Sequence, residues 1–396
     1  MGDYAGDISW IKKNIKIFLE NDLKEAIFHP DLFGNRTPLI YILNKLFNPL
    51  FSDFEKYRIS TFFFSLVGPI IFYKILRIRY NLVDKKVLFL ISSLIYLSPY
   101  YRTSAYWGLN ENYAIFTLFL SFLFLEKFLN EHKNYFRNIF LISIFSSLTI
   151  YFDQKFLIVP IICFFSIIFS NNISLKYKFF LIFSYLIFSI PYIYLFYRWG
   201  GIVPPATQIA NPKTITSLTD INLIYHIHLG YAATLISFYL IPITLFTDKN
   251  LFQKIKKMFL LKKTYFFIFI FFLFNIFNFL FFDFEKFTVT DYWVGLGVIH
   301  KLSIILFSDI FFQEIFSYCF FFLSFIILLF FFYQNKFDGL IIIYFLLISL
   351  FLWPLMQEYF DPLIIILAFL IFKSVNYFNK INSFLIFSYL LIFLLI

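Results

Sequence analysis

The sequence predicts an all-α protein, a polytopic bundle of about twelve membrane helices. Of its 396 residues, 61% are hydrophobic and only 14% are charged, whereas roughly 25% of residues are charged in soluble globular domains. The apolar residues form long runs that are apolar on every face. Such runs exclude a membrane barrel, whose strands alternate apolar and polar side chains, and predict helices, which satisfy their own backbone polar groups in lipid.

Twelve apolar segments are expected to be helical, although several are shorter than the roughly 20 residues that a perpendicular span needs. They lie at 59–79, 87–101, 112–127, 138–152, 155–170, 178–197, 223–247, 264–282, 312–333, 339–355, 360–373 and 382–396. A more polar stretch, 1–58, precedes them. We therefore divide the chain into an N-terminal segment, 1–58, and one transmembrane module, 59–396.

Basic residues gather on alternate loops. The loops at 74–86, 127–137, 171–178 and 248–263, with Lys336, Lys373 and Lys380, hold 19 of 33 Lys and Arg residues but 5 of 23 acids, counting Glu126 and Asp338 at their edges. Because cytoplasmic loops carry the positive excess, this set is assigned to the cytoplasm. Residues 1–58, 102–111, 152–155, 198–222, 283–309 and 356–361 then face the other side of a bacterial inner membrane or the endoplasmic reticulum. Because residues 1–58 are assigned to that side and need a preceding helix to carry them across the membrane, we expect a further helix upstream.

The N-terminal segment is expected to contain amphipathic helices on the non-cytoplasmic face. Asp7 is predicted to be the N-cap of the first. Its apolar residues recur at helical spacing and predict a stripe that lies on the membrane surface, made of Ile8, Ile11, Ile15 and Phe18. Trp10 falls off that stripe and is left for another contact. A second short helix is expected within residues 37–51.

The predicted outer face holds the polar residues that are candidates for function. Ionisable side chains near the ends of membrane helices are expensive to keep and often functional; here they are Glu111, Asp153, Asp291, Glu358 and Asp361. The loop RWGGIVPPATQ, residues 198–208, begins with an arginine that suits a lipid phosphate. Two alternative interpretations remain open. The ionisable side chains would snorkel at the membrane surface or pair with one another, and residues 198–208 would form a plain turn with a snorkelling arginine.

No cofactor is predicted, and a divalent metal is left open. His226 and His228 are two residues apart and face different sides of a helix, so they do not predict a metal site. The chain has no Gly-rich phosphate cradle, Walker sequence or nucleophile elbow. Nucleic-acid binding is excluded because no basic domain lies outside the expected bilayer.

Several segments resemble a known superfamily. GDYAGDISW at the start, then SPYYRTSAYWGLNENYAIF, WGGIVPP, EKFTVTDYW and LMQEYFDPLIII, are similar in order to the GT-C membrane glycosyltransferases. They most resemble the terminal alpha-1,2-glucosyltransferase of the dolichol pathway. The resemblance implies transfer of a sugar from a polyprenyl-phosphate donor to a lipid-linked or extracytoplasmic glycan acceptor, with a loop aspartate as catalytic base.

The resemblance also implies site residues. Asp3 or Asp7 would be the general base of an inverting displacement, and the sequence does not separate the two. The leaving lipid phosphate needs cations, for which the candidates are Arg36, Arg102, Arg198, Lys286 and His300. Two rival functions remain open: a flippase or transporter of lipid-linked glycans, and a glycan polymerase or ligase.

Overall fold

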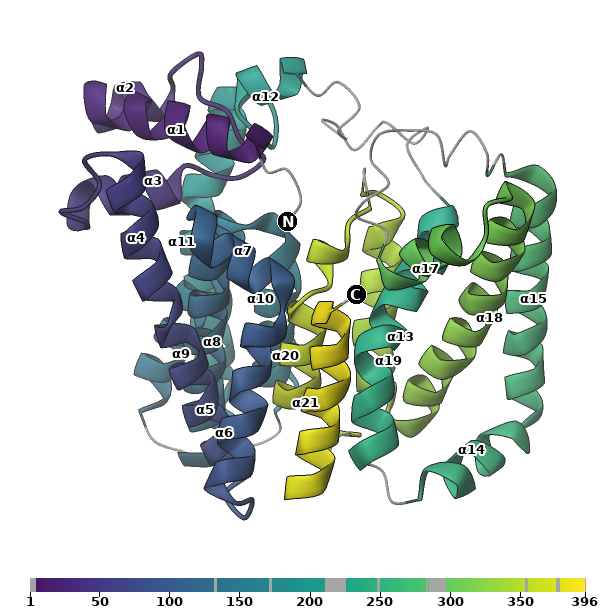
Figure 1. Cartoon of the computed structure of the whole chain (residues 1–396). Coiled ribbons are helices and arrows are strands. Elements are labelled where there is room, and N and C mark those ends of the chain that lie inside the picture. The colour runs from purple at the N-terminus through teal and green to yellow at the C-terminus, as the bar shows by residue number, and fades with distance from the viewer. Residues whose placement is uncertain are drawn as a thin grey trace. The chain divides into compact units, whose positions relative to one another are not determined.

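The computed structural model describes residues 5–131, 134–170, 173–210, 226–247, 250–282, 284, 297–352, 355–374 and 378–395. Within these ranges every regular element is a helix (Figure 1). Seven helical stretches are long and apolar enough to cross a membrane: Phe54–Arg79, Glu111–Asn130, Tyr135–Phe152, Leu175–Trp199, Ile227–Phe246, Lys262–Phe281 and Ile310–Gln334. For the described residues, the prediction of an all-α protein with apolar helices of membrane-spanning length is confirmed, while the number twelve is not.

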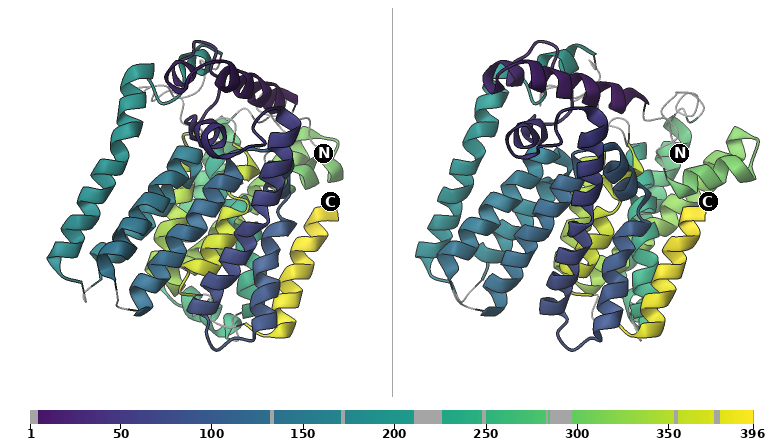
Figure 2. Two further views of the ribbon diagram at one scale, coloured as in Figure 1. Left: turned by 90° about the vertical axis from the view of Figure 1, so that its left-hand side faces the viewer. Right: turned by 60° about the vertical axis from the view of Figure 1, so that its left-hand side comes forward.

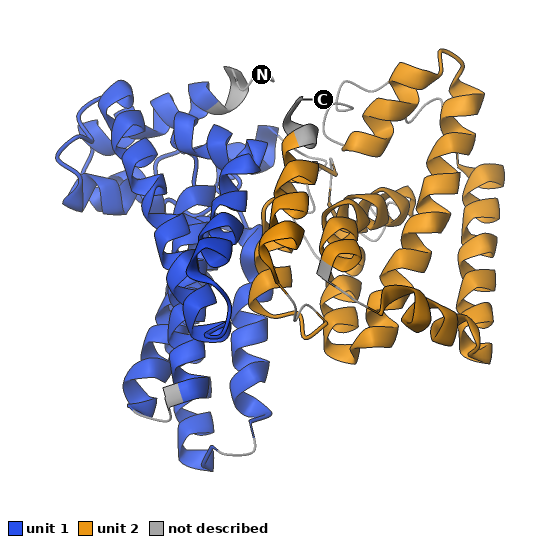
Figure 3. Ribbon diagram, turned by 60° about the horizontal axis from the view of Figure 1, so that its bottom comes forward, with its two compact units in different colours: residues 1–220 blue, residues 221–396 orange. Residues whose placement is uncertain are grey.

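The chain divides into two compact units, residues 1–220 and 221–396 (Figure 3). Unit 1 contains α1 (Ala5–Glu20), α2 (Leu23–Ile27), α3 (Leu39–Phe47), α4 (Phe54–Ser65), α5 (Val67–Arg79), α6 (Lys85–Ser93), η1 (Leu94–Leu97), α7 (Pro99–Trp107), α8 (Glu111–Glu131), α9 (Tyr135–Phe152), η2 (Gln154–Leu157), α10 (Ile158–Ile168), α11 (Leu175–Trp199) and α12 (Pro205–Ala210). Its core forms where α8 packs against α5 and α9, and α9 against α11.

Unit 2 contains α13 (Ile227–Thr247), α14 (Leu251–Phe259), α15 (Lys262–Phe281), α17 (Val298–Leu306), α18 (Ile310–Gln334), α19 (Lys336–Ser349), η5 (Gln357–Tyr359), α20 (Leu363–Leu370) and α21 (Lys380–Leu395). Here α18 packs against α13, α15 and α19. The close approach of α13 and α18 depends on Gly230, since a Cβ at this position would lie 2.3 Å from the Phe321 ring.

One expected span, 87–101, is two helices joined by a tight turn. Helix α6 ends at Ser93, η1 follows, and α7 begins at Pro99. Proline lacks a backbone N–H and is favoured in the first helical turn. Ser98 caps the new helix because its hydroxyl accepts a hydrogen bond of 3.0 Å from the backbone N–H of Tyr101. The Ser-Pro pair therefore begins a second helix in a stretch whose continuous hydrophobicity predicted a single helix.

The N-terminal helix differs from the prediction in two ways. Helix α1 includes residues before Asp7, so Asp7 is not its N-cap. Its apolar stripe is largely turned toward the protein, since Ile11, Ile15 and Phe18 are buried and α1 packs against α3 and α4. Hydrophobic periodicity identifies the helix face that is removed from water, but it does not distinguish burial against the protein from burial in lipid. Figures 1 and 2 show α1 lying across the ends of the long helices of unit 1.

The end of α7 provides a test of packing in unit 1. Gly108 has φ +74°, a Cβ added to it would lie 2.7 Å from the Tyr57 ring, and Tyr57 donates a 2.6 Å hydrogen bond to its carbonyl. We expect Gly108→Ala to lower the free energy of unfolding by about 3 kcal/mol, from backbone strain and overpacking. Gly200 has φ +68° with open space around it, so Gly200→Ala should cost about 1 kcal/mol. Equal losses in dodecyl sulfate titrations of mixed micelles would refute the packing argument.

Candidate functional site

A buried group of four charges lies in unit 1. The Arg36 guanidinium contacts Glu111 Oε1 and lies 3.2 Å from Asp153 Oδ2, and Lys155 Nζ lies 3.4 Å from Asp153 Oδ2 and 3.6 Å from Glu111 Oε1. The Glu111, Asp153 and Lys155 side chains are only 10%, 6% and 8% exposed, and Arg36 is 28% exposed. We call these four residues the charge quartet. Its formal charge is zero, which is the condition for burying charges at moderate cost.

The local backbone brings the quartet together at one end of the long helices. Glu111 is the first residue of α8, where the helix dipole favours an anion, and it accepts a 3.2 Å hydrogen bond from the Ser104 hydroxyl. Asp153 follows α9 and caps η2 by accepting from the Lys155 N–H at 3.1 Å. The turn that carries Arg36 is held to the end of α9, because Thr37 donates its hydroxyl to the Tyr151 carbonyl.

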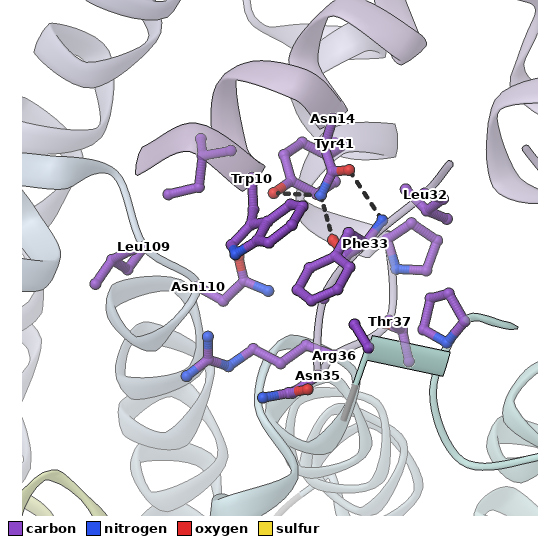
Figure 4. A pocket seen from close by; sticks show the side chains of 15 residues that line it. Trp10, Asn14, Leu32, Phe33, Asn35, Arg36, Thr37, Tyr41, Leu109 and Asn110 are labelled. Carbon is purple, nitrogen blue, oxygen red and sulfur yellow. Dashed lines mark hydrogen bonds between the residues drawn. The ribbon is translucent and has the colours of Figure 1, made fainter. Parts of the chain in front are cut away.

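A polar cavity of about 370 Å³ adjoins the quartet (Figure 4). Its lining comes from α1, the 32–38 turn, α3, the start of α8 and the α12 region: Trp10, Ile11, Asn14, Leu32, Phe33, Gly34, Asn35, Arg36, Thr37, Pro38, Tyr41, Leu109, Asn110, Pro204 and Ala210. Arg36 belongs both to this wall and to the quartet. The cavity thus has a guanidinium on one wall, with Asn35 and Asn110 as further polar groups.

Aromatic stacking and one asparagine hold the wall formed by α1. The rings of Trp10 and Phe33 are stacked with centroids 3.7 Å apart. Asn14 donates to the Phe33 carbonyl at 2.5 Å and to the Tyr41 hydroxyl at 3.2 Å, and it accepts from the Phe33 N–H at 3.2 Å (Figure 4). Trp10 therefore makes a contact off the apolar stripe, as its position predicted.

An apolar groove of about 500 Å³ shares part of the cavity wall. It is lined by Leu23, Lys24, Ile27, Phe28, Thr37, Pro38, Leu39, Ile42, Tyr151, Pro191, Tyr194 and Leu195. Thr37 and Pro38 line both spaces. Two cations accompany the groove, since Lys24 lines it and the Arg198 guanidinium lies 5.0 Å from the centre of the Phe28 ring.

The groove also lies against α11, the most exposed apolar span of unit 1. Only 11% of the most apolar part of α11 is buried within the protein. Pro191, Tyr194 and Leu195 of this helix form one side of the groove. The groove is therefore bordered by a helix whose apolar side chains are left largely uncovered by the protein.

The structure brings together three of the predicted site residues, Arg36, Glu111 and Asp153. Arg102 and Arg198 are exposed, on α7 and at the end of α11 respectively. Asp7 lies on α1, and nothing is described of its side chain. Asp3, Lys286 and Asp291 lie outside the described residues.

The remaining predicted residues belong to unit 2. His300 of α17 is 1% exposed and lies 3.5 Å from the Tyr231 hydroxyl. Burial lowers the pKa of His300 to about 4, so near pH 7 it is a neutral imidazole and supplies no positive charge to a phosphate. Glu358 lies in η5 and Asp361 is buried after it.

The sequence assigned no role to Lys155, the fourth member of the quartet. The sequence feature that could have identified Lys155 is its position, two residues after Asp153 in a short polar break between apolar runs. A buried carboxylate at such a place needs a cation as its partner. The described residues contain no cluster of three or more His, Cys, Asp or Glu side chains that is arranged for a metal. His228 Nδ1 lies 3.1 Å from the Ser349 carbonyl.

Comparisons with the models of known families, with curated proteins and with solved structures found no match to this chain.

Proposed function

We propose that this chain is a membrane glycosyltransferase that moves a sugar from a polyprenyl-phosphate donor to a lipid-linked or extracytoplasmic acceptor. The observation that carries the proposal is the shared wall between two unlike spaces. Thr37 and Pro38 line both a polar cavity, which has Arg36 on its wall, and an apolar groove. A polyprenyl-phosphate sugar has the same composition, with a polar head joined through a phosphate to a hydrocarbon chain.

The cavity suits a sugar. Its volume of about 370 Å³ is within the roughly 300–1,000 Å³ of small-molecule sites. The aromatic pair Trp10 and Phe33 offers apolar ring surface for the C–H face of a sugar. Asn35 and Asn110 offer amide donors and acceptors for hydroxyl groups.

The groove suits a prenyl chain and its phosphate. Ile27, Leu39, Ile42 and Leu195 provide apolar walls, and burial of hydrocarbon against such walls is favourable in proportion to its area. Arg36 from the cavity, with Lys24 from the groove, provides cations on both sides of the shared wall. Charge-assisted contacts of this kind stabilise a leaving phosphate.

The proposed reaction is a direct displacement. A carboxylate, Asp3 or Asp7, takes the proton of the acceptor hydroxyl as its oxygen attacks the anomeric carbon. The bond between that carbon and the phosphate oxygen breaks, the lipid phosphate leaves with its electron pair, and the configuration is inverted. Arg36 balances the charge that develops on the leaving group.

The arrangement of charges supports a transferase over a transporter. In the described spans of unit 1, the ionisable residues lie near the helix ends, as Arg58, Lys74, Glu126 and Arg137 illustrate. A transport path would be expected to place charged residues along the middle of its helices. The proposal further includes about twelve spans and an active face opposite the cytoplasm.

Loss of the aromatic wall tests the proposed function. Purified protein is supplied with radiolabelled polyprenyl-phosphate hexoses and a membrane glycan fraction, and lipid-phosphate release and glycan labelling are measured. We expect transfer by the unsubstituted chain and about a tenfold lower kcat/KM for Trp10→Ala, which removes stacking worth about 1 kcal/mol and its ordering of Phe33. Tyr197→Ala, at a side chain 82% exposed on α11, is the control.

Two results would contradict the proposal. One is that no polyprenyl-phosphate sugar is consumed by folded protein in the presence of acceptor. The other is equal activity of the Trp10→Ala and Tyr197→Ala variants, which would place sugar transfer away from the cavity.

A further inference from the structure

Helix α14 of unit 2 is a basic helix that lies flat at one end of a group of long apolar helices. It joins the end of α13 to the start of α15 and packs against α15 and α18, and Figure 1 shows it crossing that end. The adjoining spans Ile227–Phe246 and Lys262–Phe281 each have 20 residues, about the length needed to cross the hydrocarbon core. The segment between their ends therefore lies at the level of the lipid headgroups.

One face of α14 is fixed to the protein. Leu251 and Met258 are buried with Phe330 of α18 in an apolar cluster. The Thr264 hydroxyl donates a 2.6 Å hydrogen bond to the Met258 carbonyl, which ties the end of α14 to the start of α15. The apolar face of this amphipathic helix is thus already occupied, and its other face is presented outward.

The outward face combines lysines with exposed apolar side chains. Phe252 is 86% exposed and Leu260 is 73% exposed, while Lys256 and Lys257 between them are also exposed. Lys262 and Lys263 follow directly and are exposed too. Residues 250–263 contain no Asp or Glu. The face therefore has a strong positive charge with no internal compensation.

The same end of unit 2 gathers further lysines. Lys336 begins α19 beside the end of α18, and the backbone N–H of Lys373 donates to Asp338 at 3.0 Å, which places the 373–374 turn at the start of α19. Asp338 itself is fully buried, where it also accepts from the Ser374 N–H at 3.0 Å. Asp338 is thus turned inward, so its carboxylate is not presented to a partner together with these lysines.

We propose that α14 and the following Lys262 and Lys263 form a binding surface for anionic phospholipid headgroups. Lysines at headgroup level attract anionic lipids, and exposed Phe and Leu side chains among them enter the acyl boundary. An acidic protein or a nucleic acid would leave Phe252 and Leu260 in water, whereas a bilayer surface accommodates both kinds of side chain. This surface is independent of the proposed sugar transfer.

The test compares lipid binding by two matched triple variants. K256Q/K257Q/K262Q removes three charges from the surface. K13Q/K16Q/K56Q removes three exposed lysines that each lie within 3.3–3.8 Å of a carboxylate in unit 1. Each protein is incubated in micelles with equimolar phosphatidylglycerol and phosphatidylethanolamine, and the bound lipids are counted by native mass spectrometry.

The unsubstituted chain and the control are expected to prefer phosphatidylglycerol. Each lysine near the membrane surface contributes about fivefold in affinity for anionic lipid. The preference of the surface variant for phosphatidylglycerol over phosphatidylethanolamine should therefore be at least about tenfold lower. In the unsubstituted chain, 0.5 M NaCl should weaken the same preference. The single variant K257Q, with a smaller loss, gives the same test if the triple variant does not fold. Equal preference in the surface variant and the control would overturn the proposal. Tighter binding of a polyglutamate peptide or a short oligonucleotide than of phosphatidylglycerol would overturn it as well.

Discussion

Asp7→Asn is expected to reduce sugar transfer by about 10²- to 10⁴-fold if Asp7 is the general base, the usual contribution of a positioned base. An asparagine has nearly the same shape but cannot take the acceptor proton. On α1 residue 7 precedes Trp10 by three positions and Ile11 by four, which puts it on the same helix face as these two lining residues of the cavity. The measurement is kcat for each of Asp3→Asn and Asp7→Asn with saturating donor.

Asp31→Asn is the control for this experiment. Asp31 is a 63% exposed carboxylate paired with Lys13 in the same N-terminal segment, and its loss should leave kcat unchanged. Only the base variant should also lose the acidic limb of the pH profile of kcat, a change that a purely structural defect would not produce. Full activity of the double variant D3N/D7N would remove both residues from the mechanism.

Arg36→Gln is expected to destabilise unit 1 by about 3 kcal/mol, the lower end of the range for breaking a buried ion pair, because Arg36 remains partly exposed. The change leaves the Glu111 and Asp153 carboxylates with Lys155 alone, a net negative charge among side chains that are at most 10% exposed. The free energy of unfolding in dodecyl sulfate titrations checks the loss, and transfer activity should fall as well because the cavity loses its guanidinium.

A charge-balanced variant separates the burial cost from other effects. R36Q/E111Q removes one charge of each sign and leaves Lys155 with Asp153 at 3.4 Å, so it should be more stable than R36Q alone. Arg58→Gln is the control for loss of a guanidinium: Arg58 is 22% exposed, but its partner Glu55, at 2.8 Å, is 60% exposed, so the change leaves no buried carboxylate without a cation. An R36Q variant as stable as R58Q would show that the quartet is not what holds this end of unit 1.

Composition and the long apolar runs were sufficient to predict an all-helical membrane protein, because burial of backbone groups in lipid leaves few alternatives. They could not predict the break at Ser98-Pro99, where local capping interrupts a run that stays apolar. They also could not say that Ile11 and Phe18 pack on the protein rather than on lipid, since both environments favour the same side chains. Among the residues that the structure describes, seven helical stretches have the length and hydropathy to cross a membrane; the other expected segments contain shorter helices or breaks there.

The candidate site was predictable in part. Glu111 and Asp153 stand out in the sequence as acids at the ends of apolar runs, and Arg36 as a cation in a polar turn. Their meeting depends on residues 36, 111 and 153 being brought to one end of unit 1 by the packing of α8 and α9, a long-range contact that no local pattern contains. The apolar groove was not predicted because its walls come from α2, α3, α9 and α11. Helix α2 is a short helix within the polar N-terminal segment, and the other three look like ordinary apolar segments.

The Thr37–Pro38 wall has a consequence for selectivity. A free sugar can fill only the cavity, and a free lipid only the groove, so each gains one set of contacts. In the proposed function, a molecule with head and chain covalently joined would occupy both spaces, and its second contact would form at the high effective concentration set by that link. Recognition would then depend on the junction between the two parts, so that neither a longer chain nor a larger sugar could substitute for it.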